Sequence, residues 1–396
     1  MKIWFAFVLV CATAPTAVAE TVDVWFGTHT PRSGSSRGIY HASLEVPSGK
    51  WGDVSLAAEI KDCGFLTLHP SGRTLYSTGQ RDGSPSVTAF RIEGGNGTAK
   101  LHHLGSVETG AGGAAHLSAS RDGRALLSAQ YGSGTTTLYA LADDGSIDRR
   151  VSVHRHADLL DQAGSRVVPK RQNAPHAHWT GTSPDDRFAF VPDLGMDKVV
   201  IYRLDTEKPE LVHHGFGICP PGSGPRHMKF SPDGDQIYVL NELTLSVTAF
   251  DYDVTTGEME PFQTVPTLTE STKAQENFNS AAEIRVHPSG RFLYASNRGH
   301  DSITAFAVQD GGKISVVEVE PIRGSWPRNF NLDPSGRLLI AAGRDSHTAA
   351  AFSVDEQTGA LTYLRQTAQV PSPICVLFRR TPPATDQNAA AGKRSR

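Results

Sequence analysis

One turn motif recurs six times along the 396-residue chain, and its spacing constrains the fold more than any other feature of the sequence. The copies are HPSGR (69–73), SRDGR (120–124), SPDDR (183–187), SPDGD (231–235), HPSGR (287–291) and DPSGR (333–337). The fourth residues of these turns stand at positions 72, 123, 186, 234, 290 and 336, so successive turns are 46 to 63 residues apart. Repeats of about 40 to 50 residues built from short strands are typical of a β-propeller.

Each repeat contains enough short runs for one four-stranded blade. Around the fourth turn, apolar or alternating runs cover 227–230, 236–241, 246–252 and 258–264, with turn residues between them. The sequence lacks a long helical periodicity, and its 38 glycines and 24 prolines suit a chain that turns often. These features predict an all-β fold.

A seventh blade is predicted from the two ends of the chain together. The runs 22–30, 38–45 and 51–60 are typical of the three outer strands of a blade, but no inner strand precedes them. The run ICVLFRR (374–380) is similar to the predicted inner strands HMKF and EIRV, and no turn follows it. We therefore expect this run to join the N-terminal strands and close a seven-bladed β-propeller, which removes free sheet edges.

The two termini are expected to lie outside the propeller. Residues 1–19 have a positive start, an apolar stretch over 3–12 and a small-x-small site at 17–19, a pattern typical of a signal peptide. We expect an exported protein, periplasmic or secreted, without a membrane anchor. The propeller domain is assigned to 20–380, and the polar tail 381–396 is predicted to be disordered.

The composition argues against several classes of function. A net charge of -3 does not favour a nucleic-acid partner, because such proteins usually carry a basic domain. Neither a nucleophile elbow (G-x-S-x-G) nor a phosphate-binding glycine loop in the right context occurs. After the predicted leader, Cys63, Cys219 and Cys375 remain, so at most one disulfide can form, and none has a paired spacing. We expect no cofactor, and the oligomeric state is left open.

Arg226 and Glu242 stand eight residues before and eight residues after Gly234. Because positions equidistant from a hairpin turn lie side by side, this spacing predicts that an acid and a base meet at one rim. The same count before each turn gives Gly64, Ala115, His178, Arg226, Ala282 and Arg328, and the count after each turn gives Gln80, Tyr131, Leu194, Glu242, Arg298 and Arg344. Strand alternation predicts the opposite direction for the next residues, Phe65, His116, Trp179, His227, Glu283 and Asn329.

Charged residues therefore gather at both ends of this layer, although each also has a structural interpretation. Arg226 and Glu242 could form only a buried salt bridge. His178 could be a structural histidine, and Arg298 could anchor a turn through backbone carbonyls. His176 and His178 could bind a metal, but no third ligand can be named, so we expect no metal site.

Other polar segments are expected to lie away from this rim. His69 and His287 belong to the turns themselves, and we expect them to brace turns on the opposite face. The insertion 154–173 is polar and charged, and it is interpreted as a surface loop near the entry to the next blade.

Four segments carry a family resemblance: HWTGTSPDDRFAFVPDLGMDKVVIYRL (178–204), GPRHMKFSPDGDQIYVLNELTLSVTAF (224–250), AAEIRVHPSGRFLYASNRGHDSITAF (281–306) and WPRNFNLDPSGRLLIAAG (326–343). They resemble the propeller-type lactonase family, which includes bacterial 6-phosphogluconolactonase and the fungal carboxy-muconate cyclase. The resemblance covers essentially the whole chain after the leader. It implies a seven-bladed propeller that hydrolyses or closes a lactone ring without needing a metal.

The resemblance also implies roles for the rim residues. It places the catalytic cluster at His178, Arg226, Glu242 and Arg298, with either His178 or Glu242 as the base that activates water and the two arginines binding anionic oxygen. Because Glu242 lies beside Arg226, its pKa should be lowered, which favours His178. The residues expected to line the substrate pocket are His227, Glu283, Arg328 and Asn329.

Two departures limit the resemblance. The last segment ends in Ala342-Gly343-Arg344, where the family usually has Asn and a polar residue, and this difference could reshape one side of the pocket. An exported member should meet an unphosphorylated sugar lactone or another cyclic ester. A non-catalytic propeller that binds a ligand or a protein, and an oxidoreductase propeller with a metal or quinone, remain as alternatives.

Overall fold

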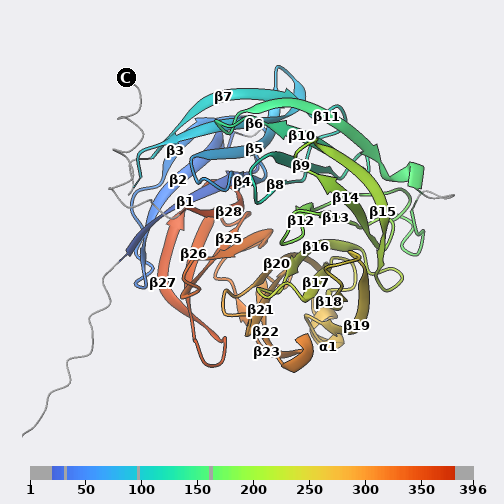
Figure 1. Cartoon of the computed structure of the whole chain (residues 1–396). Coiled ribbons are helices and arrows are strands. Elements are labelled where there is room, and N and C mark those ends of the chain that lie inside the picture. Colours follow the sequence, from blue (N-terminus) through green and yellow to red (C-terminus); the bar gives the residue numbers. More distant parts are fainter. Residues whose placement is uncertain (1–19, 31–33, 96–98, 160–163, 380–396) are drawn as a thin grey trace, which may run out of the picture.

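Twenty-eight strands form seven antiparallel sheets of four strands in the described residues of a computed structural model, which are 20–30, 34–95, 99–159 and 164–379. The sheets are arranged as blades around a common centre (Figure 1), and their innermost strands contact one another around the ring. The predicted all-β, seven-bladed propeller is confirmed. The predicted signal peptide and C-terminal tail lie outside the described residues.

Each blade is one continuous stretch of chain, except the first. The first blade contains β28 (Pro373–Arg379), β1 (Glu20–Thr28), β2 (Gly38–Val46) and β3 (Ser55–Glu59). The second contains β4 (Leu66–Leu68), β5 (Thr74–Arg81), β6 (Ser84–Glu93) and β7 (Lys100–Glu108). The third contains β8 (His116–Ala119), β9 (Ala125–Gln130), β10 (Thr135–Leu141) and β11 (Ile147–Arg155), followed by the short helix η1 (His156–Leu159).

The later blades follow the same order. The fourth contains β12 (Gly181–Thr182), β13 (Phe188–Asp193), β14 (Lys198–Asp205) and β15 (Glu210–Ile218). The fifth contains β16 (Pro225–Phe230), β17 (Gln236–Asn241), β18 (Ser246–Tyr252) and β19 (Met259–Pro266), followed by α1 (Glu270–Lys273). The sixth contains β20 (Ser280–Val286), β21 (Phe292–Arg298), β22 (Ser302–Val308), η2 (Asp310–Gly312) and β23 (Ile314–Pro321). The seventh contains β24 (Asn329–Leu332), β25 (Leu338–Gly343), β26 (Thr348–Val354) and β27 (Leu361–Gln369).

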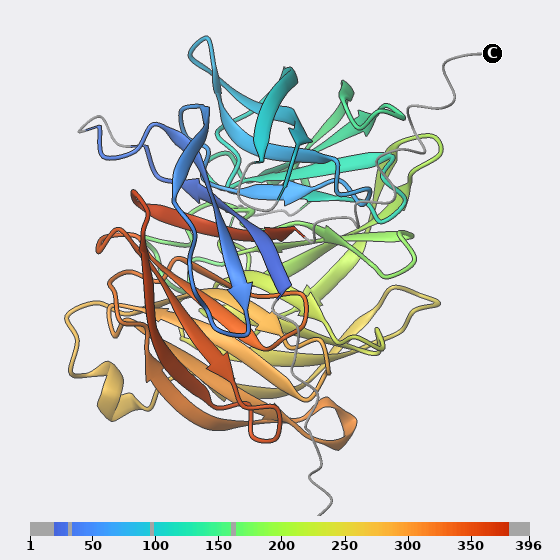
Figure 2. The same cartoon turned by 90° about the vertical axis from the view of Figure 1, so that its left-hand side faces the viewer.

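The C-terminal strand closes the ring, as the sequence predicts. β28 pairs antiparallel with β1, with Val24 opposite Phe378 and Phe26 opposite Val376. The red C-terminal and blue N-terminal strands consequently lie side by side in both views (Figures 1 and 2). Because the two ends of the chain share one sheet, no blade can leave the ring without breaking this pairing.

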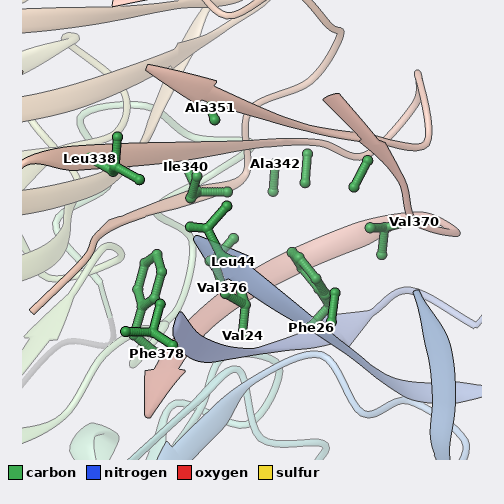
Figure 3. Close-up of a cluster of buried hydrophobic side chains, with 14 of the residues drawn as sticks. Val24, Phe26, Leu44, Leu338, Ile340, Ala342, Ala351, Val370, Val376 and Phe378 are labelled. Carbon is green, nitrogen blue, oxygen red and sulfur yellow. The ribbon is translucent and has the colours of Figure 1, made fainter. Parts of the chain in front are cut away.

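A buried apolar layer joins the first blade to the seventh. Val24, Phe26 and Val376 from the first blade pack against Leu338 and Ile340 from the seventh (Figure 3). All five side chains have no solvent exposure. Each such side chain contributes roughly 1.5 to 3 kcal/mol through the removal of apolar surface from water, so the closure is strongly stabilised.

Hydrogen bonds between neighbouring blades fix the relative position of the repeated turns. The hydroxyl of Tyr76 donates to the Gly145 carbonyl over 2.7 Å, and Tyr238 and Tyr294 make the equivalent bonds to later glycines. Nε2 of His69 bonds to the Gly123 carbonyl of the next turn over 3.1 Å, and His287 does the same to Gly336. The prediction that these two histidines brace turns is confirmed.

The interpretation of the insertion 154–173 as a surface loop is wrong for part of it. His156 is fully buried, and its ring bonds to the Asp193 carboxylate over 2.7 Å and to Thr136 over 2.9 Å. Gln172 is also fully buried, so the segment is fastened into the propeller at both ends. A polar sequence did not reveal this, because these side chains are buried through hydrogen bonds rather than apolar contact.

Cys63, Cys219 and Cys375 are all buried and unpaired. Burial raises the pKa of each thiol, so these groups stay protonated and behave as small apolar side chains.

Within the described part of the chain, no helix is long and apolar enough to span a membrane.

Removing β28 should abolish folding. A chain that ends at Pro371 loses the pairing with β1 and the buried side chains of Val376 and Phe378. This loss is comparable with the whole stability of a domain, about 5 to 15 kcal/mol. Circular dichroism should show no cooperative thermal transition, whereas a control chain that ends at Arg380 should melt like the full protein. A cooperative melt of the shorter chain would show that closure is dispensable.

Candidate active site

A cavity of about 190 Å³ opens where the inner strands begin. Five of the six entry positions taken from the turn spacing line it: Gly64, Ala115, His178, Arg226 and Arg328. The remaining lining residues are Thr28, His29, Asp62, Phe65, Ala114, His227, Asn329 and Ile374. The repeat therefore brings residues from five blades to one mouth, as the register predicts, and Thr28 and Ile374 add the first blade.

The strand register in the fifth blade differs from the predicted symmetry about Gly234. β16 and β17 pair with His227 opposite Leu240 and Pro225 opposite Asn241, so a bulge falls at Arg226. The backbone N–H of Glu242 donates to the Gly224 carbonyl over 2.8 Å rather than pairing with Arg226. The long Arg226 side chain nevertheless reaches Glu242, so the side-chain prediction is confirmed although the backbone symmetry is wrong.

The bulge also overturns the predicted alternation. Arg226 and His227 both line the cavity, although neighbouring residues of a regular strand point to opposite sides. Arg328 and Asn329 also both line the cavity, and Arg328 lies before the first residue of β24. A bulge reorients one side chain relative to the next, and bulges are frequent beside functional sites.

A repeated asparagine positions the residues at the exit of the second strand. Nδ2 of Asn241 donates to Ser246 over 3.1 Å and to Thr248 over 2.9 Å, and Asn297 makes the same two bonds in the sixth blade. Both asparagines are fully buried. The end of each strand is thereby fixed, and the next residue along the chain is Glu242 or Arg298.

Glu242 lies among three arginines that come from three different segments. Its Oε2 accepts a hydrogen bond from Nε of Arg226 over 2.9 Å, and its Oε1 lies 2.6 Å from Nη2 of Arg171 and 3.2 Å from Nη2 of Arg298. Burial alone raises the pKa of Glu242, but Arg298, Arg226 and Arg171 outweigh it and lower the value to about 2. The carboxylate is therefore ionised at neutral pH and is a weak proton acceptor.

Arg226 is almost fully buried and holds several groups at once. Its Nη1 donates to the Ala282 carbonyl and, over 3.0 Å, to Nε2 of His227. No described residue accepts a hydrogen bond from its Nη2, and the side chain lines the cavity. Burial, Arg328 and Arg298 lower its pKa, while Glu242 opposes that shift. Arg226 thus both binds the Glu242 carboxylate and lines the cavity.

Arg298 contacts both a backbone carbonyl and the Glu242 carboxylate. Its Nη2 donates to the Ala281 carbonyl over 3.0 Å, and the same atom is the one paired with Glu242. Its guanidinium also lies 5.6 Å from the centre of the Trp326 ring, which Arg344 approaches to 4.7 Å. Arg344 pairs with Asp345 over 2.6 Å and does not line the cavity, so this departure from the family pattern acts next to the pocket.

His178 is a buried histidine of the cavity wall without a hydrogen-bond partner on its side chain among the described residues. Its ring lies 5.2 Å from that of His227 and 5.5 Å from that of Tyr131. Burial and, after it, the positive charge of Arg226 lower the pKa of His178 well below its usual range. The imidazole is therefore neutral at pH 7 and has a free lone pair.

His227, Glu283 and Asn329 form a network beneath the cavity. Nδ1 of His227 donates to Oε1 of Glu283 over 3.1 Å, so Nε2 is left to accept from Arg226. Nδ2 of Asn329 donates to Oε2 of the same glutamate, which Arg285 also approaches to 3.4 Å. Glu283 is fully buried and does not line the cavity. The network fixes the tautomer of His227 and satisfies the carboxylate.

Arg328 is the free cation of the site. It lines the cavity, and its guanidinium has no hydrogen-bond or ion-pair partner in the described residues. Burial and the nearby Arg298 lower its pKa to about 10, so it remains charged at neutral pH. An unpaired guanidinium in a cavity can bind a carboxylate, a phosphate or a developing oxyanion through paired donors.

Arg171 is the residue of this cluster that the sequence did not reveal. It belongs to the insertion after the third blade, far from the turn register, and only its proximity to Glu242 identifies it.

Among the described residues, no group of three or more His, Cys, Asp or Glu side chains could hold a metal ion. His176 instead stacks on Tyr131, with ring centres 4.5 Å apart.

The model of the family described as "Lactonase, 7-bladed beta-propeller" matches residues 23–378. The chain belongs to this lactonase family.

Individual relatives agree with that assignment. The chain is 33% identical to the 6-phosphogluconolactonase of Bacillus subtilis over 356 residues, which cover 89% of this chain and 97% of the relative. Two solved structures each have a TM-score of 0.81. One, a putative 6-phosphogluconolactonase from Bacteroides uniformis, is 29% identical and covers 91% of this chain and 99% of its own. The other, the periplasmic gluconolactonase of Pseudomonas aeruginosa, is 30% identical and covers 92% and 100%.

The charge of Glu242 should be measurable as pH-dependent stability. Its pKa in the folded protein is about 2, against 4.5 for a free side chain, so its contribution is present above pH 4.5 and is lost as the pH falls through 2. Glu242→Gln should lower the free energy of unfolding by about 3 kcal/mol at pH 7 and by less at pH 3.5.

Chemical denaturation at the two pH values tests this prediction. Asp345→Asn is the matched control, because Asp345 also pairs with an arginine but is half exposed, and such pairs contribute about 0 to 1 kcal/mol. Equal losses in the two variants, or a loss for Glu242→Gln that does not change with pH, would contradict the assignment.

Proposed function

We propose that this lactonase is an exported enzyme that hydrolyses a sugar-type lactone, with His178 as general base and arginines that stabilise the oxyanion. The observation that carries the proposal is the neutral, unpartnered His178 beside Arg226 and Arg328 on one cavity wall. Hydrolysis needs a base for water and a positive group at the carbonyl oxygen, and this wall contains both.

The division of roles follows from the charges. Glu242 is paired with three arginines and has a pKa of about 2, so it accepts protons poorly. His178 is neutral and has no competing hydrogen bond, so it can take a proton from water as the water oxygen attacks the carbonyl carbon. The ring C–O bond then breaks, and the proton on His178 passes to the departing ring oxygen. The products are a hydroxy acid and, after ionisation, one proton.

Two arginines are suited to the carbonyl oxygen. Nη2 of Arg226 has no acceptor among the described residues, and Arg328 has no ion-pair partner at all in that part of the chain. Arg298 acts through Glu242, which it neutralises together with Arg226. His227 and Asn329 would contact substrate hydroxyl groups, and Glu283 would hold both residues in place.

The substrate class and the export follow from different observations. Relatives of this chain include a 6-phosphogluconolactonase and a periplasmic gluconolactonase, and both of these names refer to sugar lactones. The pattern of residues 1–19 is that of a signal peptide, so the periplasmic relative is the nearer functional parallel. We therefore favour an unphosphorylated sugar lactone and no metal cofactor.

Purified protein should accelerate lactone hydrolysis in a pH-stat. The substrates are gluconolactone, 6-phosphogluconolactone and a muconolactone, each measured against the uncatalysed rate. His178→Ala should lower kcat by about a hundredfold to ten-thousandfold, because a general base contributes that much. His176→Ala is the control, since this neighbouring histidine lies outside the cavity lining. Arg298→Ala and Glu242→Gln should also lower kcat.

The outcome separates an enzyme from a binding protein. A wild-type rate equal to the uncatalysed rate for all three lactones would mean that the rim only binds a ligand or a protein. An active wild type with unchanged His178→Ala activity would assign the base elsewhere.

The pH profile gives a second test of His178. A general base works only when it is unprotonated, so kcat/KM should rise with pH through the pKa of His178 and then remain level. Because burial and Arg226 lower that pKa well below 6.5, the level region should extend to pH 6 and below. A half-maximal rate near pH 6.5 or above would contradict a neutral, buried base.

A further inference from the structure

The described residues 164–174, which lie between η1 and β12, are called the strap here, and they contact the third, fourth and fifth blades. The strap contacts the third blade through Arg171, whose Nη2 lies 3.4 Å from the hydroxyl of Tyr131. The same Nη2 lies 2.6 Å from Glu242 in the fifth blade. The strap thus links two blades that are separated by the blade carrying His178.

Gln172 anchors the strap beside Arg171. It is fully buried, and its Nε2 donates to the Leu194 carbonyl over 2.9 Å and to Oδ1 of Asp197 over 2.6 Å. Its Oε1 accepts from the backbone N–H of Val168 over 2.9 Å, which folds the strap on itself. A single buried amide therefore fixes the strap to the fourth blade and limits where the preceding side chain, Arg171, can reach.

The anchor continues into the backbone that supports Glu242. Asp197 accepts from the N–H of Gly222 over 2.6 Å and from that of Gly224 over 2.9 Å. The Gly224 carbonyl in turn accepts from the N–H of Glu242. Gly224 has φ +64°, a conformation that favours glycine, so this turn has little freedom to be rebuilt. The strap consequently holds Glu242 both through its backbone and through its carboxylate.

We propose that Arg171 is a positioning residue for the reaction: it holds the Glu242 carboxylate from outside the blades, so that Arg226 stays directed into the cavity. This inference rests on the proposed lactonase function. Arg171 does not line the cavity, and its side chain is 34% exposed, so it acts through Glu242 rather than on the substrate. Glu242 shares one oxygen between Arg171 and Arg298 and uses the other for Arg226.

The physical reason lies in the number of cations around one carboxylate. With only Arg226 and Arg298, either guanidinium could take both oxygens of Glu242 in a paired interaction. Arg171 occupies Oε1 together with Arg298, which leaves Oε2 for Nε of Arg226. Nη2 of Arg226 then stays free of Glu242. Because a shift of about 1 Å in a catalytic group can cost roughly a hundredfold in rate, this restraint matters for turnover.

The test compares Arg171→Ala, Arg171→Lys and Lys170→Ala in hydrolysis of gluconolactone. Lys170 is the matched control, because it is the exposed neighbour and its removal changes the net charge equally. Arg171→Ala should lower kcat about tenfold to a hundredfold with little change in KM, since substrate contacts are intact. Arg171→Lys should recover part of kcat, and Lys170→Ala should match wild type.

The pH at which Glu242 takes up a proton is a second measurable quantity, and a purely structural role of Arg171 would not change it. Glu242 is faced by Arg171 on the strap, Arg226 on β16 and Arg298 on β21, with Arg328 and Tyr131 nearby. Removing Arg171 raises the pKa of Glu242, so protonation should reach the carboxylate at a higher pH. The acid midpoint of unfolding should therefore move to higher pH in Arg171→Ala and stay in place in Lys170→Ala.

A stability measurement keeps the inference separate from the proposed activity. Arg171→Ala should lower the free energy of unfolding more than Lys170→Ala at pH 7, and this difference should shrink at pH 3.5. If wild type hydrolyses no lactone, the proposed function fails, and the stability comparison still decides whether Arg171 holds Glu242. If wild type is active and Arg171→Ala keeps its kcat and its acid midpoint of unfolding, the positioning role is wrong.

Discussion

The pairing of β28 with β1 is the constraint on which the rest of the molecule depends. It places residues from the two ends of the chain in one sheet and removes the free edges that an open array of blades would expose. Closure also sets the diameter of the ring, and so decides how far apart the entries of the inner strands lie. Residues as distant in sequence as Ile374, Gly64 and Arg328 share one cavity only because the ring is closed.

Within that frame, the chemistry of the site is governed by one carboxylate and its arginines. Glu242 is kept ionised by Arg171, Arg226 and Arg298, while burial keeps His178 neutral. The two potential bases are therefore separated by environment, as happens wherever one site needs groups of different protonation state. The cluster as a whole adds little net stability, because the desolvation of several charges offsets much of their attraction, whereas removal of one member leaves the others buried and unpaired.

Much of this arrangement could be predicted from the sequence, because a repeat converts spacing into position. The turn motif predicted six blades and five cavity residues, and the runs at the two ends of the chain predicted the seventh blade and its closing strand. The bulge at Arg226 could not be predicted, since it depends on the Gly224 carbonyl and on Asp197 from the preceding blade. Arg171 could not be predicted as part of the site for a similar reason. It lies 71 residues from Glu242 on a segment outside the repeat, where no periodicity relates sequence to space.

The charge balance explains how a rim of arginines can favour hydrolysis of a neutral ring. Arg171, Arg226 and Arg298 surround the carboxylate of Glu242, and Arg328 adds an unpaired cation to the cavity, whereas Glu283 lies beside Arg285. A lactone ring carries no net charge, so this excess of positive charge does little for the bound substrate. In the proposed reaction, negative charge develops on the carbonyl oxygen only as water attacks, and the arginines would then stabilise the transition state more than the ground state. The same excess attracts the carboxylate of the product, so turnover in the proposed reaction requires the product to leave a site that matches its charge.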